Sequence, residues 1–314
     1  MLGGSYRFTV LSSQSSDVST QLSAQAWYLI PQSLSVMLFA DLDLARRLEA
    51  AEGYACAQFA LARRRVSPES ASEAVLIKGA DVVYDGPESP TTQTFGLGMF
   101  FDTDDATLEQ MEQFFLSRGA PVQHEVCPFV GAATLQLLCA RGYKPIEVSN
   151  VLYRLVGAAK RHATVNRTAG NGQPKIRVRV IGPGESDKWT RISARGWAHE
   201  HPELEDFMFK IGALVTAREG SACFLAEIDG EPGAAGALSI HQGVALFAGA
   251  STVPELRRRG LQSALLEARL RYARKRGCDV AMMVTETGSN SQRNAERQGF
   301  QVAYTRVKWK KDSL

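Results

Sequence analysis

The most informative segment of this 314-residue chain is Val253-Pro254-Glu255-Leu256-Arg257-Arg258-Arg259-Gly260-Leu261-Gln262-Ser263-Ala264-Leu265-Leu266. Its pattern predicts the end of a strand, a tight basic turn with one glycine, and then an amphipathic helix. Such a turn leaves unpaired backbone N–H groups at the helix N-terminus, where a phosphate group can dock. The helix dipole and the three arginines add positive potential at the same point. A solvated helix start is the simpler alternative for the three arginines.

The basic turn resembles the acetyl-CoA pyrophosphate loop of the GNAT N-acetyltransferases, whose pattern is Arg/Gln-x-x-Gly-x-Gly/Ala. Arg257 and Gly260 match this pattern, whereas Gln262 stands at the place of its final small residue. The resemblance implies that acetyl-CoA is a co-substrate whose pyrophosphate is bound by backbone amides of the turn. It also implies that the pantetheine arm pairs with exposed strand backbone in a gap between two splayed strands. The cofactor-binding residues predicted in this way are Thr252, Val253, Arg257, Arg258, Arg259, Gly260, Leu261, Gln262, Ser263, Asn290, Ser291 and Arg293.

Length and composition indicate a globular protein of two domains. The chain accommodates two domains of roughly 150 residues each. Its 45% hydrophobic and 22% charged content is ordinary for a soluble protein. A net charge of +3 is too small to favour nucleic acid as a partner. The five cysteines include no Cys-x-x-Cys pair, which argues against a disulfide framework or a zinc site and fits a reducing cytoplasm.

The sequence shows neither a membrane span nor a secretory leader. No run approaches the roughly 20 apolar residues that cross a bilayer. The N-terminus has no basic region followed by an apolar run. We therefore expect a cytoplasmic protein without a membrane partner, either a monomer or a homodimer.

Two regions of the chain, 157 residues apart, resemble each other. Each contains a helix, a glycine with an aromatic residue after it, and a β-rich strand: Leu135–Tyr143 with Ile146–Leu155, and Arg293–Phe300 with Gln301–Trp309. A diverged duplication accounts for the likeness, and two unrelated αβ domains with a similar ending are the alternative. Residues 156–175 lack periodicity and are predicted to be a linker.

The basic turn has an acidic counterpart in the first half. Its glycine lies 39 residues before Gly299, and the same distance before Gly142 leads into Asp102-Thr103-Asp104-Asp105. The aspartates would repel a pyrophosphate. We therefore predict a degenerate GNAT-like domain at 1–155 that lacks the CoA loop, and an acetyl-CoA-binding GNAT domain at 176–314.

The elements expected in residues 176–314 follow the order βααβββαβαβ, which the resemblance identifies with the GNAT fold. They are Ile176–Ile181, Glu185–Ala198, Asp206–Ala217, Ala222–Ile228, Ala234–His241, Val244–Thr252, a helix from Leu261, Val280–Val284, a helix that Ser289 caps, and Gln301–Trp309. A strand at Thr94–Phe101 and a helix at Ala106–Phe115 are expected around the aspartates of the first half. The predicted fold class is α/β (α+β): two GNAT-like domains, each a mixed, largely antiparallel sheet flanked by helices.

Acyl transfer to an amine requires a base, a donor for the oxyanion and, for the leaving thiolate, an acid. Many GNAT enzymes use as this acid a tyrosine five residues before the phenylalanine of the Gly-Phe pair, and this chain has Ala295 there. The last helix is similar to a GNAT subgroup that also lacks the tyrosine, with Ser-x-Arg-x-x-Glu-Lys/Arg-x-Gly-Phe matched by Ser291, Arg293, Glu296, Arg297, Gly299 and Phe300. Ser291 or Asn290 could lie near the thiol, or cap the helix. A backbone amide near Val253 is the expected oxyanion donor.

The predicted base lies in the polar loop between the first two helices of the second half, where Glu200, His201 and Glu203 stand. The catalytic candidates are Glu200, Glu203 and Ser291. Further candidates for the base are His241, Glu227 and Glu255, although Glu255 could instead fix the turn. His199 and His201 lack a matched third ligand, so no metal is expected.

The sequence thus predicts an acyl-CoA-dependent N-acyltransferase that transfers acetyl to a primary amine by direct attack in a ternary complex. A non-catalytic acyl-CoA-binding module is the alternative from another class, because Ala295 stands where an acid is often found. The acceptor could also be a protein amine, but no peptide groove is evident, so a small-molecule amine is favoured. In the first half, His124-Glu125 and Asp104-Asp105 are predicted to be strand-edge and turn residues rather than catalytic groups.

Overall fold

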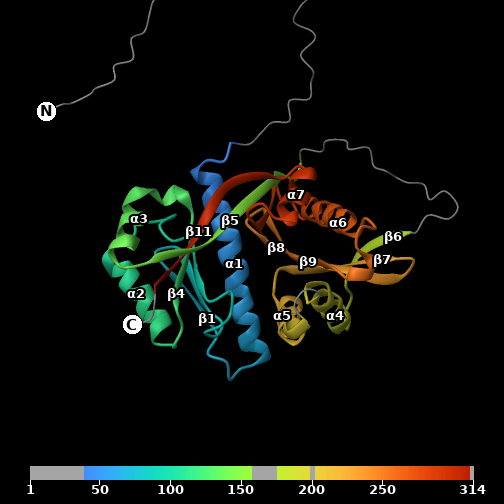
Figure 1. Cartoon of the computed structure of the whole chain (residues 1–314), viewed down its shortest axis with the longest axis horizontal. Coiled ribbons are helices and arrows are strands. Elements are labelled where there is room, and N and C mark those ends of the chain that lie inside the picture. The colour runs from blue at the N-terminus through green and yellow to red at the C-terminus, as the bar shows by residue number, and fades with distance from the viewer. Residues whose placement is uncertain (1–38, 158–174, 199–201, 312–314) are drawn as a thin grey trace, which may run out of the picture. The chain divides into compact units, whose positions relative to one another are not determined.

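Eleven strands form one mixed, mostly antiparallel sheet in the computed structural model, which describes residues 39–157, 175–198 and 202–311 (Figure 1). Most of the predicted linker lies outside these residues. The strand order is β1-β2-β3-β4-β11-β5-β10-β9-β8-β7-β6. The strands are β1 (Glu73–Ile77), β2 (Ala80–Tyr84), β3 (Gln93–Phe95), β4 (Val122–Val126), β5 (Lys144–Leu155), β6 (Ile176–Val180), β7 (Ser221–Ile228), β8 (Glu231–His241), β9 (Val244–Thr252), β10 (Val280–Glu286) and β11 (Gln301–Lys311).

Helices cover both faces of this sheet. They are α1 (Leu42–Val66), α2 (Asp105–Leu116), α3 (Gly131–Ala140), α4 (Ser186–Trp197), α5 (Glu205–Ala217), α6 (Leu261–Lys275) and α7 (Asn290–Arg297), with short 3₁₀ turns at Pro128–Val130, Pro202–Leu204 and Pro254–Leu256. None of those in the described ranges combines the length and the apolar character that a membrane-spanning helix requires.

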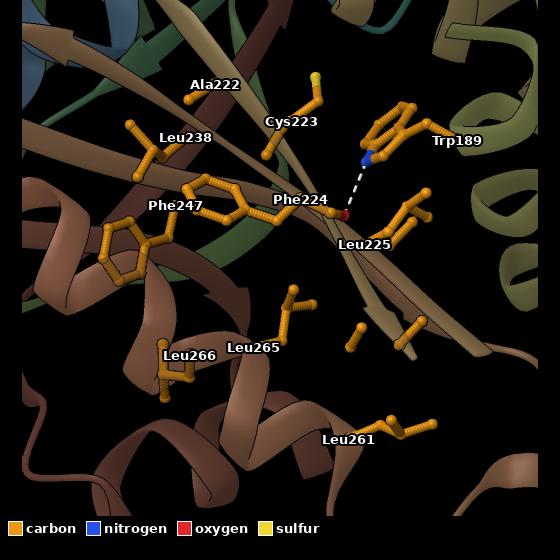
Figure 2. Packing of buried hydrophobic residues seen from close by; sticks show 14 of the residues in the cluster. Trp189, Ala222, Cys223, Phe224, Leu225, Leu238, Phe247, Leu261, Leu265 and Leu266 are labelled. Carbon is orange, nitrogen blue, oxygen red and sulfur yellow. Dashed lines mark hydrogen bonds between the residues drawn. The ribbon is translucent and has the colours of Figure 1, made fainter. Parts of the chain in front are cut away.

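The alternation of side chains along β9 shows which helix lies on which face. Val244 and Leu246 belong to the core cluster that α1 supplies, whereas Phe247 belongs to the cluster that holds the apolar face of α6. Successive strand residues point to opposite faces, so α1 and α6 cover opposite faces of β9. In Figure 2, Leu265 of α6 lies on the side of Phe247, and Trp189 of α4 donates its indole N–H to the Phe224 carbonyl at 2.9 Å.

The last strand of each half is inserted beside strands of the other half. β11 lies between β4 and β5, and β5 lies between β11 and β10 (Figure 1). In the register of this central pair, Ser149 faces Arg306, its counterpart 157 residues along the chain. The central pairing therefore relates the halves by a local two-fold symmetry. The predicted fold class is confirmed, with the addition that the two sheets are continuous. The domain division at 1–155 and 176–314 stays a prediction, because β5 and β11 cross it.

A buried ion cluster joins β11 to the first half. Arg306, which is 1% exposed, lies 2.7 Å from Glu52 and 3.4 Å from Glu49, both on α1, and 3.0 Å from Glu125 on β4. Burial raises the pKa of Glu49 and of Glu125, and the positive charge of Arg306 opposes this shift. The sequence prediction that Glu125 is a strand-edge residue is wrong, because β11 covers that edge of β4.

His124, on the same strand, is also buried rather than at an edge. Its imidazole Nε2 lies 3.0 Å from the Tyr143 hydroxyl, which donates to Glu112 at 3.0 Å. Burial lowers the pKa of His124 to about 3. This histidine is therefore a neutral core residue.

Two-residue hairpins recur in both halves. Asp229 and Gly230 join β7 to β8 with φ of 51° and 89°, and Lys78 and Gly79 join β1 to β2 with φ of 48° and 76°. Two consecutive positive φ angles indicate a type I′ turn, whose twist suits a hairpin. The hairpin predicted at Asp229-Gly230 is confirmed.

The strand predicted at Thr94–Phe101 is wrong over most of its length. β3 ends at Phe95, after which Gly96 and Gly98 adopt φ of 76° and 69° and turn the chain. Glycine tolerates these left-handed angles, so the apolar residues after Phe95 enter the core from a turn instead of a strand. The helix predicted to follow is present as α2.

Candidate functional site

β9 and β10 diverge, and the gap between them opens a pocket. Their parallel pairing extends only from Val244 opposite Val280 to Leu246 opposite Met282. Beyond that point, the β9 residues from Phe247 to Thr252 line a pocket of about 890 Å³ together with Met283 and Val284 of β10. From Phe247 onward, the edge of β9 that faces β10 is no longer paired with β10. The gap between two strands that the resemblance implied therefore begins at Phe247.

The open N-terminus of α6 forms one end of this pocket. Gly260 is the N-cap, with φ of 87° and no side-chain cap. The first helical bond runs from the Ala264 N–H to the Gly260 carbonyl at 3.1 Å, so the three amides before Ala264 precede the helical ladder. Arg258, with φ of 62°, adds a second left-handed residue. Alternating backbone conformations of this kind make a concave set of N–H groups that suits an anion.

The three arginines of the turn have different surroundings. Arg257 donates from Nε to the Thr252 carbonyl at 3.3 Å and from a terminal nitrogen to the Gly196 carbonyl at 3.2 Å. These bonds tie the turn to β9 and to α4. Arg258 is exposed and lines the pocket, whereas Arg259 is exposed and lies outside the lining. Arg257 and Arg258 therefore both line the pocket, and Arg257 also holds the turn in position.

Gln262 departs from the sequence pattern, and the structure shows what it contacts. Its side-chain amide donates to the Thr252 hydroxyl at 2.7 Å and so links the first turn of α6 to the end of β9. The amide side chain reaches across to the strand, which a small residue could not do. The departure leaves the left-handed conformation of Gly260 unchanged.

Nine of the twelve predicted cofactor-binding residues line the pocket: Thr252, Arg257, Arg258, Gly260, Leu261, Gln262, Ser263, Asn290 and Ser291. Val253, Arg259 and Arg293 are not in the lining. The Val253 N–H donates to the Gly233 carbonyl at 2.9 Å, and its own carbonyl accepts from the Leu256 N–H at 3.1 Å. These bonds engage the backbone of Val253 within the chain. The pairing of Val253 with the pantetheine arm and a backbone amide near Val253 as the oxyanion donor stay predictions. The available backbone lies earlier, between Phe247 and Ser251.

Helix α7 supplies another wall of the pocket. Its N-cap is Ser289, whose hydroxyl accepts from the Gln292 N–H at 3.2 Å, so the predicted cap is confirmed. With Ser289 as the cap, the side chains of Asn290 and Ser291 lie at the pocket. Residues outside the predicted cofactor-binding set continue the same wall, namely Asn294, Ala295, Arg297 and Gln298. Helical spacings of four and seven from Asn290 and Ser291 were the signal that could have found them.

The candidate bases either do not line the pocket or lie outside the described residues. His199, Glu200 and His201 lie outside the described residues. Glu203 is exposed and does not line the pocket. The roles of Glu200, Glu203 and Ser291 stay predictions.

The remaining three candidates have partners of their own. Glu227 accepts from Arg179 at 2.9 Å, and Glu255 lies 3.5 Å from Arg195. His241 stacks on Tyr54 with ring centroids 4.4 Å apart, and burial lowers its pKa. None of the three lines the pocket.

Two further pocket residues, Trp197 and Arg269, lie outside the predicted cofactor-binding set, and only the folded chain brings them there. Trp197, at the end of α4, is 49% exposed and lines the pocket. Arg269, in the middle of α6, also lines the pocket but is 3% exposed. Arg269 stands on the apolar face of its helix, where the spacing predicts a core residue.

Comparisons with known proteins agree with this geometry. Residues 187–300 match the model of the acetyltransferase (GNAT) family. No curated protein is significantly similar in sequence. Among solved structures, a GCN5-related N-acetyltransferase from Kribbella flavida is similar with a TM-score of 0.55, at 16% identity over 82% of this chain and 96% of that chain. A functionally unknown conserved protein from Staphylococcus epidermidis has a TM-score of 0.52, at 8% identity over 80% and 98%.

A tandem GNAT protein from the clavulanic acid biosynthesis pathway is also similar, with a TM-score of 0.50, at 14% identity over 87% of this chain and 96% of that chain. At these identities the likeness concerns the fold alone. Residues 187–300 thus match the acetyltransferase (GNAT) family, and the fold of the chain is similar to that of a tandem GNAT protein.

Proposed function

We propose that the protein is an acyl-CoA-dependent N-acyltransferase that acetylates a primary amine. One observation carries the proposal: the uncapped, cationic N-terminus of α6 opens into the same pocket as the unpaired edge of β9. The first feature suits a pyrophosphate, and the second suits an extended amide-containing arm.

In the proposed reaction, the deprotonated amine attacks the thioester carbonyl carbon within a ternary complex. The C–N bond forms, the C–S bond breaks, the amine proton passes to a base, and the CoA thiolate takes up a proton. Backbone amides between Phe247 and Ser251 are the proposed donors to the oxyanion. Glu200 and Glu203 remain the proposed bases. Ser291 or Asn290 is the proposed group near the thiol, because both residues line the pocket.

A small-molecule amine is the favoured acceptor, and a protein amine is the alternative. The non-catalytic acyl-CoA-binding module is supported by Ala295, which is 2% exposed and lines the pocket where an acid is often found. A methyl side chain transfers no proton, so the leaving thiolate would need another donor or direct protonation by water.

The test combines CoA binding with turnover. We expect calorimetry to detect CoA binding, and incubation of acetyl-CoA with a panel of primary amines and peptides to release free thiol. Thiol release with peptides alone would favour a protein acceptor. Binding without any thiol release would instead support the non-catalytic module, and absence of CoA binding would overturn both.

A further inference from the structure

Arg269 is a buried positive charge without an ion-pair partner in the described part of the chain. Its guanidinium donates to the Ala237 carbonyl at 3.2 Å and lies 4.9 Å from the centroid of the Phe247 ring. Its Nε is buried and has no hydrogen-bond partner among the described residues. Burial lowers the pKa of Arg269 to about 10, which leaves the side chain charged at neutral pH. A buried charge in this state is costly unless an anion accompanies it.

The contacts of α6 place Arg269 at the inner end of the pocket. Gln262 touches Thr252 at the outer end of β9, and Arg269 lies over Phe247, where the pairing of β9 with β10 stops. The helix therefore runs antiparallel to the strand. From Gly260 to Arg269 the helix rises by roughly 13 Å. A pyrophosphate on the N-terminus of α6 is thus beyond the reach of Arg269, and the pocket has two separate cationic ends.

An acyl-CoA bound with its pyrophosphate on the turn would extend its arm along β9 from Thr252 toward Phe247. Its acyl group would then lie at the end of the pocket that Arg269 lines. An acetyl group carries no charge and would leave the guanidinium unpaired. An acyl group with a terminal carboxylate would place an anion beside it, and a carboxylate matches the planar guanidinium fork.

We propose that the pocket accepts CoA thioesters of short dicarboxylic acids, and that Arg269 binds the terminal carboxylate as a specificity-determining residue. This inference rests on the proposed function and widens its donor class. The carboxylate takes no part in the bond changes. The amine still displaces the thiolate at the thioester carbon, and the product is an amide that retains a free carboxylate.

The test compares donors that share four acyl carbons but differ in charge, namely succinyl-CoA and butyryl-CoA, with CoA itself as the reference. We expect calorimetry to show at least about tenfold tighter binding of succinyl-CoA than of butyryl-CoA, because a desolvated charge pair contributes more than 1.4 kcal/mol. In R269M the preference should disappear or reverse, while CoA should bind within about threefold of the unmodified protein. R269K keeps the charge but not the fork, and should retain part of the preference.

The matched control is R274M, which replaces an exposed arginine in the last turn of the same helix. This variant should keep the full preference for succinyl-CoA over butyryl-CoA. CoA binding without a preference for succinyl-CoA in the unmodified protein would overturn the inference and leave the proposed function standing. An equal loss of all three ligands in R269M, with a lowered melting temperature, would assign Arg269 a structural role and also overturn it. Absence of CoA binding would remove both.

Discussion

Helices α2 and α6 hold equivalent places in the two halves, but their N-terminal ends differ. At α2 the Asp104 carboxylate accepts from the Thr107 N–H at 2.8 Å and from the Thr107 hydroxyl at 2.5 Å. At α6 the cap is Gly260, and the amides after it face a pocket. The N-terminal amides of α2 therefore have an acceptor in their own chain, whereas those of α6 are open to the pocket. The difference teaches that one internal carboxylate can occupy a helix end that otherwise stays open to an anion.

The two gaps beside these helices differ in the same way. In the first half, β3 pairs with β4 only at Thr94 opposite His124, and the turn after β3 buries Met99 in the core with Cys127. In the second half, the gap between β9 and β10 is a pocket. The first half therefore buries core side chains after β3, where the second half has a pocket beside β9.

The largest expected effect concerns the ion cluster that joins the halves. R306M should lower the free energy of unfolding by about 3–5 kcal/mol, because the buried Glu49 and Glu125 and the partly buried Glu52 would lose their common cation. Urea denaturation measures this loss. S149A at the symmetry-related position is the control and should change stability by less than about 0.5 kcal/mol. Equal losses of unfolding free energy in R306M and S149A would show that the ion cluster does not stabilise the position of β11.

The second effect tests whether the α6 end is the anion site. R258D makes this turn resemble the acidic turn of the first half, and aspartate tolerates the left-handed φ of this position. We expect CoA affinity to fall by about 100-fold in calorimetry, because attraction is replaced by repulsion at the phosphate. K210E, an exposed charge reversal on α5, should leave the affinity unchanged. Similar losses in both variants would indicate a general charge effect instead of a site.

The third effect concerns His124, whose symmetry-related residue is Met283, because Trp309 faces His124 as Leu152 faces Met283. Because burial lowers the folded pKa of His124 to about 3, the unfolded chain binds a proton below about pH 6.5 that the folded chain does not. Stability should therefore fall as pH decreases from 6.5 toward 3, by up to about 1.4 kcal/mol per pH unit. H124Q should reduce this slope between pH 6.5 and 5. The half-exposed His241 serves as control, and an equal change in H241Q would contradict the assignment.

The smallest effect tests the internal cap of α2. D104A should lower the melting temperature slightly and leave CoA binding unchanged, because the Thr107 amide loses its acceptor. Hydrogen bonds from Thr107 lower the pKa of Asp104, so its stabilising contribution is present above the ordinary carboxyl pKa and is lost as pH falls through the lower folded value. D102A in the same turn is the control. Altered CoA binding in D104A would show that the first half also serves the ligand.

The sequence was sufficient where short segments fix their own conformation. The basic turn, the hairpin at Asp229-Gly230 and the cap at Ser289 depend on neighbouring residues, and the structure has them as predicted. The strand expected at Thr94–Phe101 failed because an apolar run bounded by glycines can enter a core from a turn as well as from a strand. The hydrogen bond of the Val253 amide could not be predicted from neighbouring residues, because its partner, Gly233, lies on another strand.

The sequence by itself determined the fold family of the second half, the end of the pocket that suits a phosphate, and the acidic replacement in the first half. These features follow from residues within one turn of each other, where backbone sterics and charge act locally. Only the tertiary structure decided that β5 and β11 exchange places, that Arg306 is buried among three carboxylates, and that Arg269 reaches the pocket. Those outcomes depend on strand pairing and helix packing between distant segments, which the spacing of residues along a chain does not specify.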